Sequence, residues 1–191
     1  MDLADFKLDA RSALPDALRV LLEDYPRDAW ETDPGFSDLV RFWLERHLMF
    51  RRLVDIMSGE VEDVLDDGME RRTYGAHLMR YGSFFMQELH SHHMIEDHQY
   101  FPRLRGMDSR LSWGFDLLDR DHHAIDAHLD GFAEDTNAVL ARIQQEGDPS
   151  RALETFRGRL QSTRHLLDRH LTDEEELIVP VILKYAPSGV V

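Results

Sequence analysis

The sequence predicts an all-α protein, an up-down-up-down four-helix bundle preceded by an extra short N-terminal helix. In four long segments, apolar residues recur at alternating steps of three and four, which is the spacing of helices that pack in a bundle. No segment alternates polar and apolar residues over a useful length, so strands are not expected. The connections between the four segments are short, which favours antiparallel neighbours.

The first two helices have proline and glycine signals at their expected ends. Residues 13–24 are expected to form the short N-terminal helix, with Pro15 in its first turn and Pro26 just past its end. The Asp33-Pro34-Gly35 turn then opens the first long helix. We expect Ser58-Gly59 to end that helix.

Three further long helices complete the predicted bundle. An acidic connection over residues 60–68 leads into the second helix, which is expected to end near Pro102. The third is expected from about Ser112 to Glu146, and Gly147-Asp148-Pro149 separates it from the fourth. Pro180 is expected to interrupt the fourth helix near its end.

The length of 191 residues suits one domain. Within it we expect an N-terminal extension with the short helix over 1–35, the bundle over 36–185 and a C-terminal tail over 186–191. Hydrophobic residues make up 42% of the chain, which is enough to bury a core.

Charge and composition exclude several classes of function. The formal net charge of −15 repels phosphate backbones and anionic lipid headgroups, so neither nucleic acid nor membrane is an expected partner. The N-terminus lacks the features of a secretory signal and no run of about 18 apolar residues occurs, so we expect a cytoplasmic protein. The absence of cysteine excludes disulfides, thiolate metal sites and cysteine nucleophiles.

Each long helix carries a histidine on its apolar stripe, and on two helices a glutamate follows one turn later. In an antiparallel bundle the four histidines fall in one layer, with the two glutamates one turn further along. Burying such groups unpaired costs several kcal/mol apiece, a cost that a bound metal cluster removes. The six predicted site residues are His47, His92, Glu96, His122, His170 and Glu174.

The ligand types favour two ions over one. Glu96 and Glu174 can each place one oxygen on each of two ions, with the four histidines as terminal ligands. Mixed imidazole and carboxylate ligands suit iron or manganese, with zinc as a redox-inert competitor. The alternative is a metal-free helical scaffold, in which the same residues form a purely protein network of His–Glu pairs.

The remaining histidines fall off the apolar stripes. His123 and His165 lie on polar stripes and are expected to be exposed. His93 and Asp97 form a parallel pair one step round the second helix, and the sequence leaves open whether either joins the site. The others are expected at the surface or at an interface: His77, His90, His98 and His128.

Four motifs, in order on the four helices, resemble the hemerythrin HHE cation-binding family over about residues 36–185. They are ERHLMFR, HHMIEDHQYFP, RDHHAIDAHL and HLTDEEELIVP. The resemblance implies a hemerythrin-like four-helix bundle around a non-haem di-iron centre with a solvent-derived bridge. By this resemblance, the four histidines of the predicted site are terminal ligands and its two glutamates are bridging.

Two departures from the oxygen-carrying members bear on function. Those proteins have His-x-x-x-His in the third helix, where this chain has Asp126 four residues after His122. They also space His and Asp by five in the fourth helix, whereas His170 and Glu174 are four apart. Both departures, with two imidazoles expected on each ion, argue against reversible oxygen carriage.

The expected function is that of a di-iron protein that reacts with a small ligand: oxygen, peroxide or nitric oxide. Whether this makes it an oxygen- or peroxide-consuming oxidoreductase is left open. The alternative is a non-catalytic iron or oxygen sensor, or an iron-binding store, in which metal occupancy controls folding or partner binding. The sequence indicates neither the electron donor nor the oligomeric state.

Overall fold

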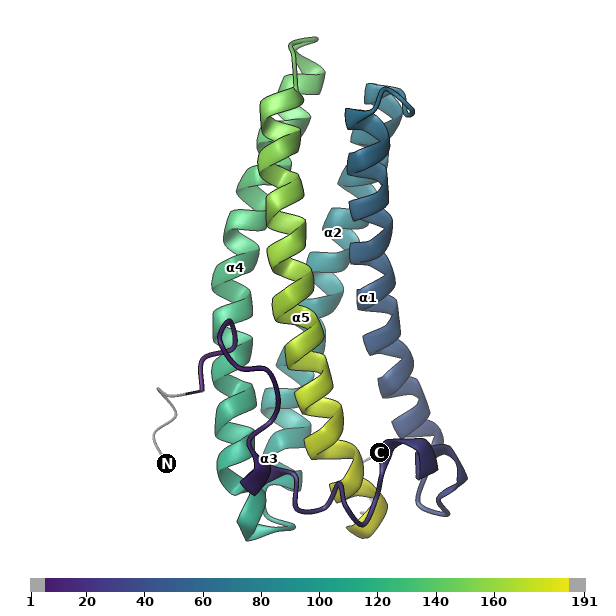
Figure 1. The fold of residues 1–191 in the computed structure, drawn as a ribbon, viewed down its shortest axis with the longest axis vertical. Coiled ribbons are helices and arrows are strands. Elements are labelled where there is room, and N and C mark those ends of the chain that lie inside the picture. The colour runs from purple at the N-terminus through teal and green to yellow at the C-terminus, as the bar shows by residue number, and fades with distance from the viewer. Residues whose placement is uncertain (1–5, 186–191) are drawn as a thin grey trace. The chain divides into compact units, whose positions relative to one another are not determined.

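The computed structural model describes residues 6–185, so the expected tail over 186–191 lies outside the described residues. All regular structure in 6–185 is helical, which confirms the all-α class. Figure 1 shows the four long helices, α1, α2, α4 and α5. The elements in chain order are η2 (Asp16–Leu18), η3 (Arg27–Thr32), α1 (Asp38–Leu65), α2 (Arg71–Ile95), η4 (Glu96–Tyr100), α3 (Phe101–Leu104), η5 (Ser109–Leu111), α4 (Ser112–Gln144) and α5 (Ser150–Tyr185).

The described chain divides into two compact units. Unit 1 contains residues 6–48, 92–124 and 168–185, and unit 2 contains residues 49–91 and 125–167. Each of the four long helices contributes one segment to each unit. The expected division of the chain at residues 35 and 185 stays a prediction.

An aromatic core holds unit 2 together. Phe50, Phe85, Phe132 and Phe156 come from α1, α2, α4 and α5 respectively, and all four are fully buried. Their ring centroids lie 6.4, 5.7 and 5.3 Å apart in that order, distances at which aromatic pairs attract one another. All four belong to the apolar stripes that the 3–4 spacing predicts.

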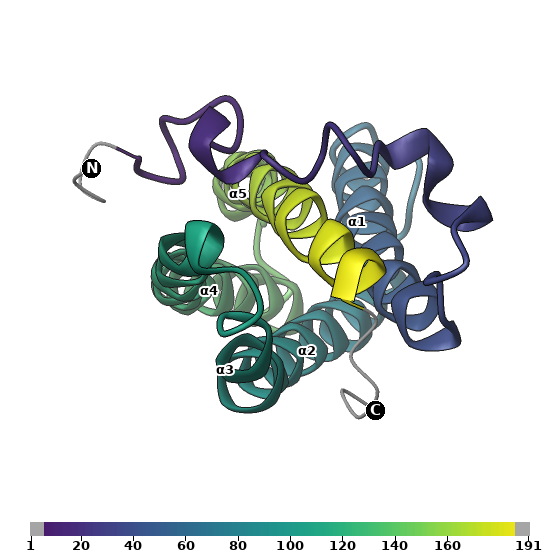
Figure 2. The ribbon, with the colours of Figure 1, turned by 90° about the horizontal axis from the view of Figure 1, so that it is seen from below.

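Unit 1 owes part of its core to residues 6–36, here called the N-terminal segment. Figure 2 shows this segment, in purple, passing α5 toward the start of α1. Its buried side chains, among them Leu18 and Trp30, join one apolar cluster with Trp43 of α1, Phe115 of α4 and Leu177 of α5. Across residues 6–185, no helix combines the length and apolar composition needed to cross a membrane.

The short N-terminal helix expected over residues 13–24 is wrong as an α-helix. Only the 3₁₀ helix η2 forms there, followed by turns. Successive N–H groups bond three residues back, from Leu18 to the Pro15 carbonyl and from Leu22 to the Arg19 carbonyl. These turns bury the leucines against the core of unit 1, so tertiary packing outweighs the helical spacing of the segment.

The first long helix does not end at Ser58-Gly59 as expected but continues to Leu65. A Cβ at Gly59 would meet nothing within 4 Å, so this glycine is simply an exposed position that costs about 1 kcal/mol relative to alanine. The next turns bury Val61 and Val64 in unit 2. Full burial of a valine contributes about 1.5–3 kcal/mol, which outweighs the glycine cost.

The second long helix changes its hydrogen bonding before Pro102. The α2 helix ends at Ile95, and the π-helical turn η4 joins it to the short α3. Pro102 has no N–H for the carbonyl one α-turn earlier, which is a physical reason for the wider turn. Pro180 is accommodated differently, because α5 runs through it without a break. The expected interruption at Pro180 is therefore wrong.

The predicted boundary between the third and fourth helices is confirmed. Helix α4 begins at Ser112, and α5 begins at Ser150, directly after the Gly147-Asp148-Pro149 sequence. The Gly147 N–H bonds the Arg142 carbonyl at 3.0 Å, which satisfies a free carbonyl at the end of α4. The Asp148 carboxylate accepts the Ser150 N–H at 3.1 Å and caps α5.

Candidate metal centre

Seven buried histidine and glutamate side chains of unit 1 form two ligand groups. In each group, one possible ligand atom per residue lies within 4.8 Å of all the others. The residues come from α1, α2, η4, α4 and α5, so all the long helices contribute. The three-histidine group is His93, His122 and His170, and the two-histidine group is His47, His92, Glu96 and Glu174.

All six residues that the sequence singles out lie in these groups, and His93 is the seventh. The His93 ring is 2% exposed and stacks on His122, with centroids 3.9 Å apart. One apolar stripe cannot contain both His92 and His93, because neighbouring residues on a helix point about 100° apart. The His-His doublet was not a sufficient signal, because in the second doublet of the chain, His122-His123, the second histidine is exposed.

Both glutamates belong to the two-histidine group and also face the three-histidine group. Glu96 Oε1 is 3.1 Å from Nε2 of His92, while its Oε2 is 3.8 Å from Nε2 of His122. Glu174 Oε2 is 3.4 Å from Nε2 of His47 and 3.6 Å from Nε2 of His170. Each carboxylate therefore faces one histidine of each group.

Two candidate ligand histidines are oriented by carboxylates on the side away from the groups. Nδ1–H of His47 donates to Glu175 at 3.0 Å, and Nδ1–H of His122 donates to Asp97 at 2.8 Å. Donation from Nδ1–H places the ring lone pair on Nε2, the atom that faces the candidate ligand groups, and Nε2 of His47 lies 3.0 Å from Nε2 of His92. Asp97, which the sequence left undecided, thus contacts the candidate ligand His122 from behind.

Burial sets the protonation of the site. The pKa values of His92 and His170 are held well below the usual range, first by burial and then by the neighbouring imidazoles. The neutral imidazoles that result are the form that binds metals. Burial also raises the pKa of Glu96, and it raises that of Glu174 well above normal with help from the Glu96 charge.

Several candidate ligand atoms make no hydrogen bond within residues 6–185. Nε2 of His122 and both ring nitrogens of His170 are buried without a hydrogen-bond partner there, and both oxygens of Glu174 are buried without a donor. Each unsatisfied buried polar group costs about 1–3 kcal/mol. Bound cations would satisfy one nitrogen lone pair of each imidazole and the carboxylate oxygens together, so the residues fit a metal cluster.

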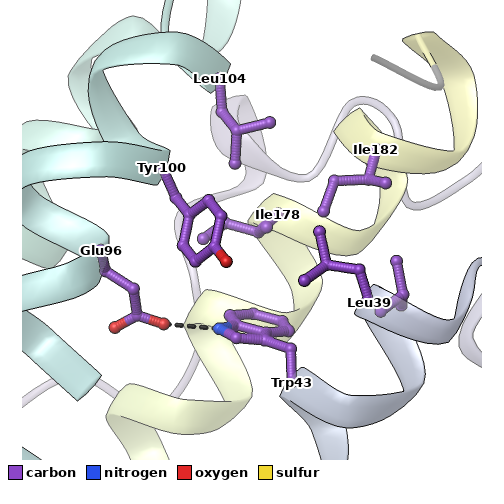
Figure 3. A pocket seen from close by; sticks show the side chains of 8 residues that line it. Leu39, Trp43, Glu96, Tyr100, Leu104, Ile178 and Ile182 are labelled. Atoms are coloured by element: carbon purple, nitrogen blue, oxygen red, sulfur yellow. Dashed lines mark hydrogen bonds between the residues drawn. The ribbon is translucent and has the colours of Figure 1, made fainter. Parts of the chain in front are cut away.

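An apolar pocket adjoins the two-histidine group at Glu96. It is lined by Leu39, Val40, Trp43, Glu96, Tyr100, Leu104, Ile178 and Ile182. Figure 3 shows Trp43 at its base, where the indole N–H donates to Glu96 Oε1 at 2.5 Å. The cavity volume of about 20 Å³ holds little more than one water-sized molecule.

The other histidines lie outside the two groups. His123 and His165 are exposed, as their polar stripes predict. His77 pairs with Glu60 at 2.8 Å, and His128 lies 2.8 Å from the Thr163 hydroxyl. The exposed His90 and His98 complete the set.

Comparison with known proteins agrees with this geometry. The family model described as the hemerythrin HHE cation binding domain matches residues 38–182. Neither the curated proteins nor the solved structures include a significant match to the chain. The family match covers α1, α2, α4, most of α5 and every residue of the two candidate ligand groups. The chain therefore belongs to the hemerythrin HHE cation-binding family.

Proposed function

We propose that this protein binds two non-haem iron ions and reacts there with a small ligand: oxygen, hydrogen peroxide or nitric oxide. The observation that supports this proposal is the set of seven buried candidate ligands in two groups, in which each glutamate faces a histidine of both groups. Each histidine group would hold one ion, and Glu96 and Glu174 would bridge them. A site of this kind supplies redox chemistry toward small oxygen-containing ligands.

The donor set favours iron or manganese. Nitrogen and oxygen donors without thiolate suit both metals, and more donors are present than one tetrahedral zinc ion requires. The two bridging carboxylates would offset two of the four charges of a pair of divalent ions. A solvent-derived bridge is the remaining part of the proposed cofactor.

The fifth imidazole changes the argument about oxygen carriage. With four histidines, each ion was expected to receive two imidazoles, and that symmetry argued against reversible binding. With His93 as a ligand, the imidazoles divide into three and two. Ligand symmetry therefore no longer counts against carriage, and reversible binding and net turnover are the two outcomes that an experiment must separate.

The pocket beside Glu96 supports a ligand of very few atoms. Its walls are almost entirely apolar, and its cavity of about 20 Å³ is too small for an organic substrate. Trp43 fills the space between this pocket and the His47 ring, with centroids 4.3 Å apart. The pocket leaves room for a diatomic molecule beside Glu96.

The helices of this proposed site follow one another in up-down-up-down order. The short connections at residues 66–70 and 145–149 support this order, because so few residues can join only adjacent, oppositely directed helices.

Metal analysis of the purified protein tests the proposal. We expect about two iron ions per chain after expression with ample iron. His122→Ala and His93→Ala should lower the metal content, while the matched exposed variant His123→Ala should leave it unchanged. Zero or one ion per chain in the wild type would overturn the proposal.

The reaction is tested by stopped-flow absorbance together with an oxygen electrode. Full recovery of the starting spectrum when oxygen is removed indicates carriage, and net consumption of oxygen or peroxide indicates turnover. Inertness to oxygen, peroxide and nitric oxide would refute the reactive function and favour a sensor or store.

A further inference from the structure

We propose that Arg11 and Arg27, both in the N-terminal segment, are positioning residues of the metal centre. Each acts through one carboxylate on one ligand histidine, and the two histidines belong to different ligand groups. The inference rests on the proposed two-metal function. It assigns a role to a segment that lies before the matched family region, which begins at residue 38.

Arg27 acts on the two-histidine group through Glu175. Its Nη1 lies 2.6 Å from Oε2 of Glu175, and the other oxygen of the same carboxylate accepts from His47 Nδ1 at 3.0 Å. Glu175 is only 3% exposed, so the carboxylate has little water to compete for it. The guanidinium also lies 4.8 Å from the ring centroid of Trp30, a buried residue that holds η3 against unit 1.

Arg11 acts on the three-histidine group through Asp121. Its guanidinium bonds both oxygens of Asp121, and its Nε donates to Asp173 at 2.6 Å. Oδ2 of Asp121 lies 3.7 Å from Nδ1 of His170, which is too long for a hydrogen bond, so the carboxylate acts on this ring through its nearby charge. Arg11 and Asp121 are nearly fully buried, so the guanidinium fixes the position of that charge behind His170.

The physical consequence is control over metal retention at each ion. A carboxylate behind a ligand imidazole fixes the ring and raises its basicity, and losing such a partner typically weakens metal binding roughly 10–100-fold. An arginine that clamps the carboxylate keeps it aimed at the imidazole. Without the arginine, the carboxylate can turn away from the ring, and the ion bound by that ring should be released faster.

Arg19 provides the matched control within the same segment. Its side chain is 40% exposed, close to the 48% of Arg27, and it pairs with Glu176 on α5 at 3.6 Å. In the described part of the chain, the Glu176 carboxylate has no hydrogen bond to a histidine. Replacing Arg19 therefore removes a similar cation and a similar link to α5 without touching a ligand.

The experiment measures iron release from the full chain, loaded with two ferrous ions, to a colorimetric chelator. His47→Ala and His93→Ala assign the kinetic phases to the two-histidine and three-histidine ions. Arg27→Gln should speed release of the first ion roughly 10–100-fold and leave the second unchanged. Arg11→Lys keeps the positive charge but cannot bond both oxygens of Asp121 as the guanidinium does. This variant should speed release of the ion in the three-histidine group alone.

The controls separate positioning from general packing. Arg19→Gln should release both ions at wild-type rates, and Arg27→Lys should partly rescue the effect of Arg27→Gln. If Arg11→Lys does not fold, Asp121→Asn tests the same arm, because Arg11 keeps its bond to Asp173.

Equal acceleration of both ions, or rates equal to those of Arg19→Gln, would overturn the inference. A wild type that binds fewer than two ions would instead overturn the proposed function.

Discussion

Replacing His170 by leucine should stabilise the metal-free protein while removing its capacity for a full metal pair. His170 is fully buried, and neither of its ring nitrogens has a hydrogen-bond partner within the described residues. Its closest carboxylate oxygens, on Glu174 and Asp121, lie 3.6 and 3.7 Å away. In the metal-free state the imidazole is therefore a desolvated polar group without compensation.

The expected size of the effect follows from that desolvation. An unsatisfied buried polar group costs about 1–3 kcal/mol, and an apolar side chain of similar volume avoids the cost. We expect His170→Leu to raise the free energy of unfolding of the metal-free protein by about 1–3 kcal/mol. For a chain of this length, that corresponds to a rise in Tm of roughly 2–12 °C.

Bound metal should reverse the order of stability of the wild type and the His170→Leu variant. Ferrous iron at about 100 times its Kd adds about 2.7 kcal/mol to the stability of the wild type, and the variant should gain less because it lacks one ligand. Urea unfolding followed by circular dichroism, with chelator and then with ferrous iron, measures both states. His165→Leu, at an exposed position on the same helix, is the control and should change stability by less than about 0.5 kcal/mol.

A metal-free His170→Leu protein that is less stable than the wild type by more than about 1 kcal/mol would refute the reasoning. It would mean that the imidazole contributes to the stability of the core without any metal.

Three further predictions test other parts of the structure. Trp43→Phe removes the hydrogen bond that the indole donates to Glu96. Hydrogen bonds to charged groups contribute about 1.5–3 kcal/mol, so the metal affinity measured by chelator competition should fall roughly tenfold or more. An unchanged Kd for the metal would contradict this role of Trp43. Metal binding at pH 7 should release protons, because burial raises the pKa of Glu96 to about 7 and that of Glu174 well above its usual range, and binding requires both carboxylates. Titration calorimetry in buffers of different ionisation enthalpy measures this release, which should decline as the pH rises through these pKa values, and zero release at pH 7 would contradict it. Gly59→Ala should stabilise the protein by about 0.5–1 kcal/mol in urea unfolding. Gly35→Ala should destabilise it, because a Cβ there would lie 2.9 Å from the Leu183 carbonyl oxygen. The opposite order of stability would argue against the packing of α1 and of the turn before it.

Helical periodicity in the sequence predicted most of the candidate site. The stripe positions Phe50, Phe85, Phe132 and Phe156 are buried in unit 2, and the histidines and glutamates on the same stripes are buried in unit 1. Periodicity succeeds here because residues three and four apart on a helix share a face whatever that face packs against. The ends of the helices were predicted less well from the sequence. Gly59 and Pro180 look like helix breakers, yet packing in the next turns carries both helices onward.

The sequence by itself determined the helical class, the faces turned inward and six of the seven candidate ligands. Only the tertiary structure decided that His93 joins them and that Arg11 and Arg27 reach the carboxylates behind His170 and His47. The reason is physical. Helix periodicity relates positions within one helix, but the rotation of each helix depends on its contacts with the other helices. The path of the irregular N-terminal segment depends on contacts between residues more than a hundred positions apart, for which no local pattern carries a signal.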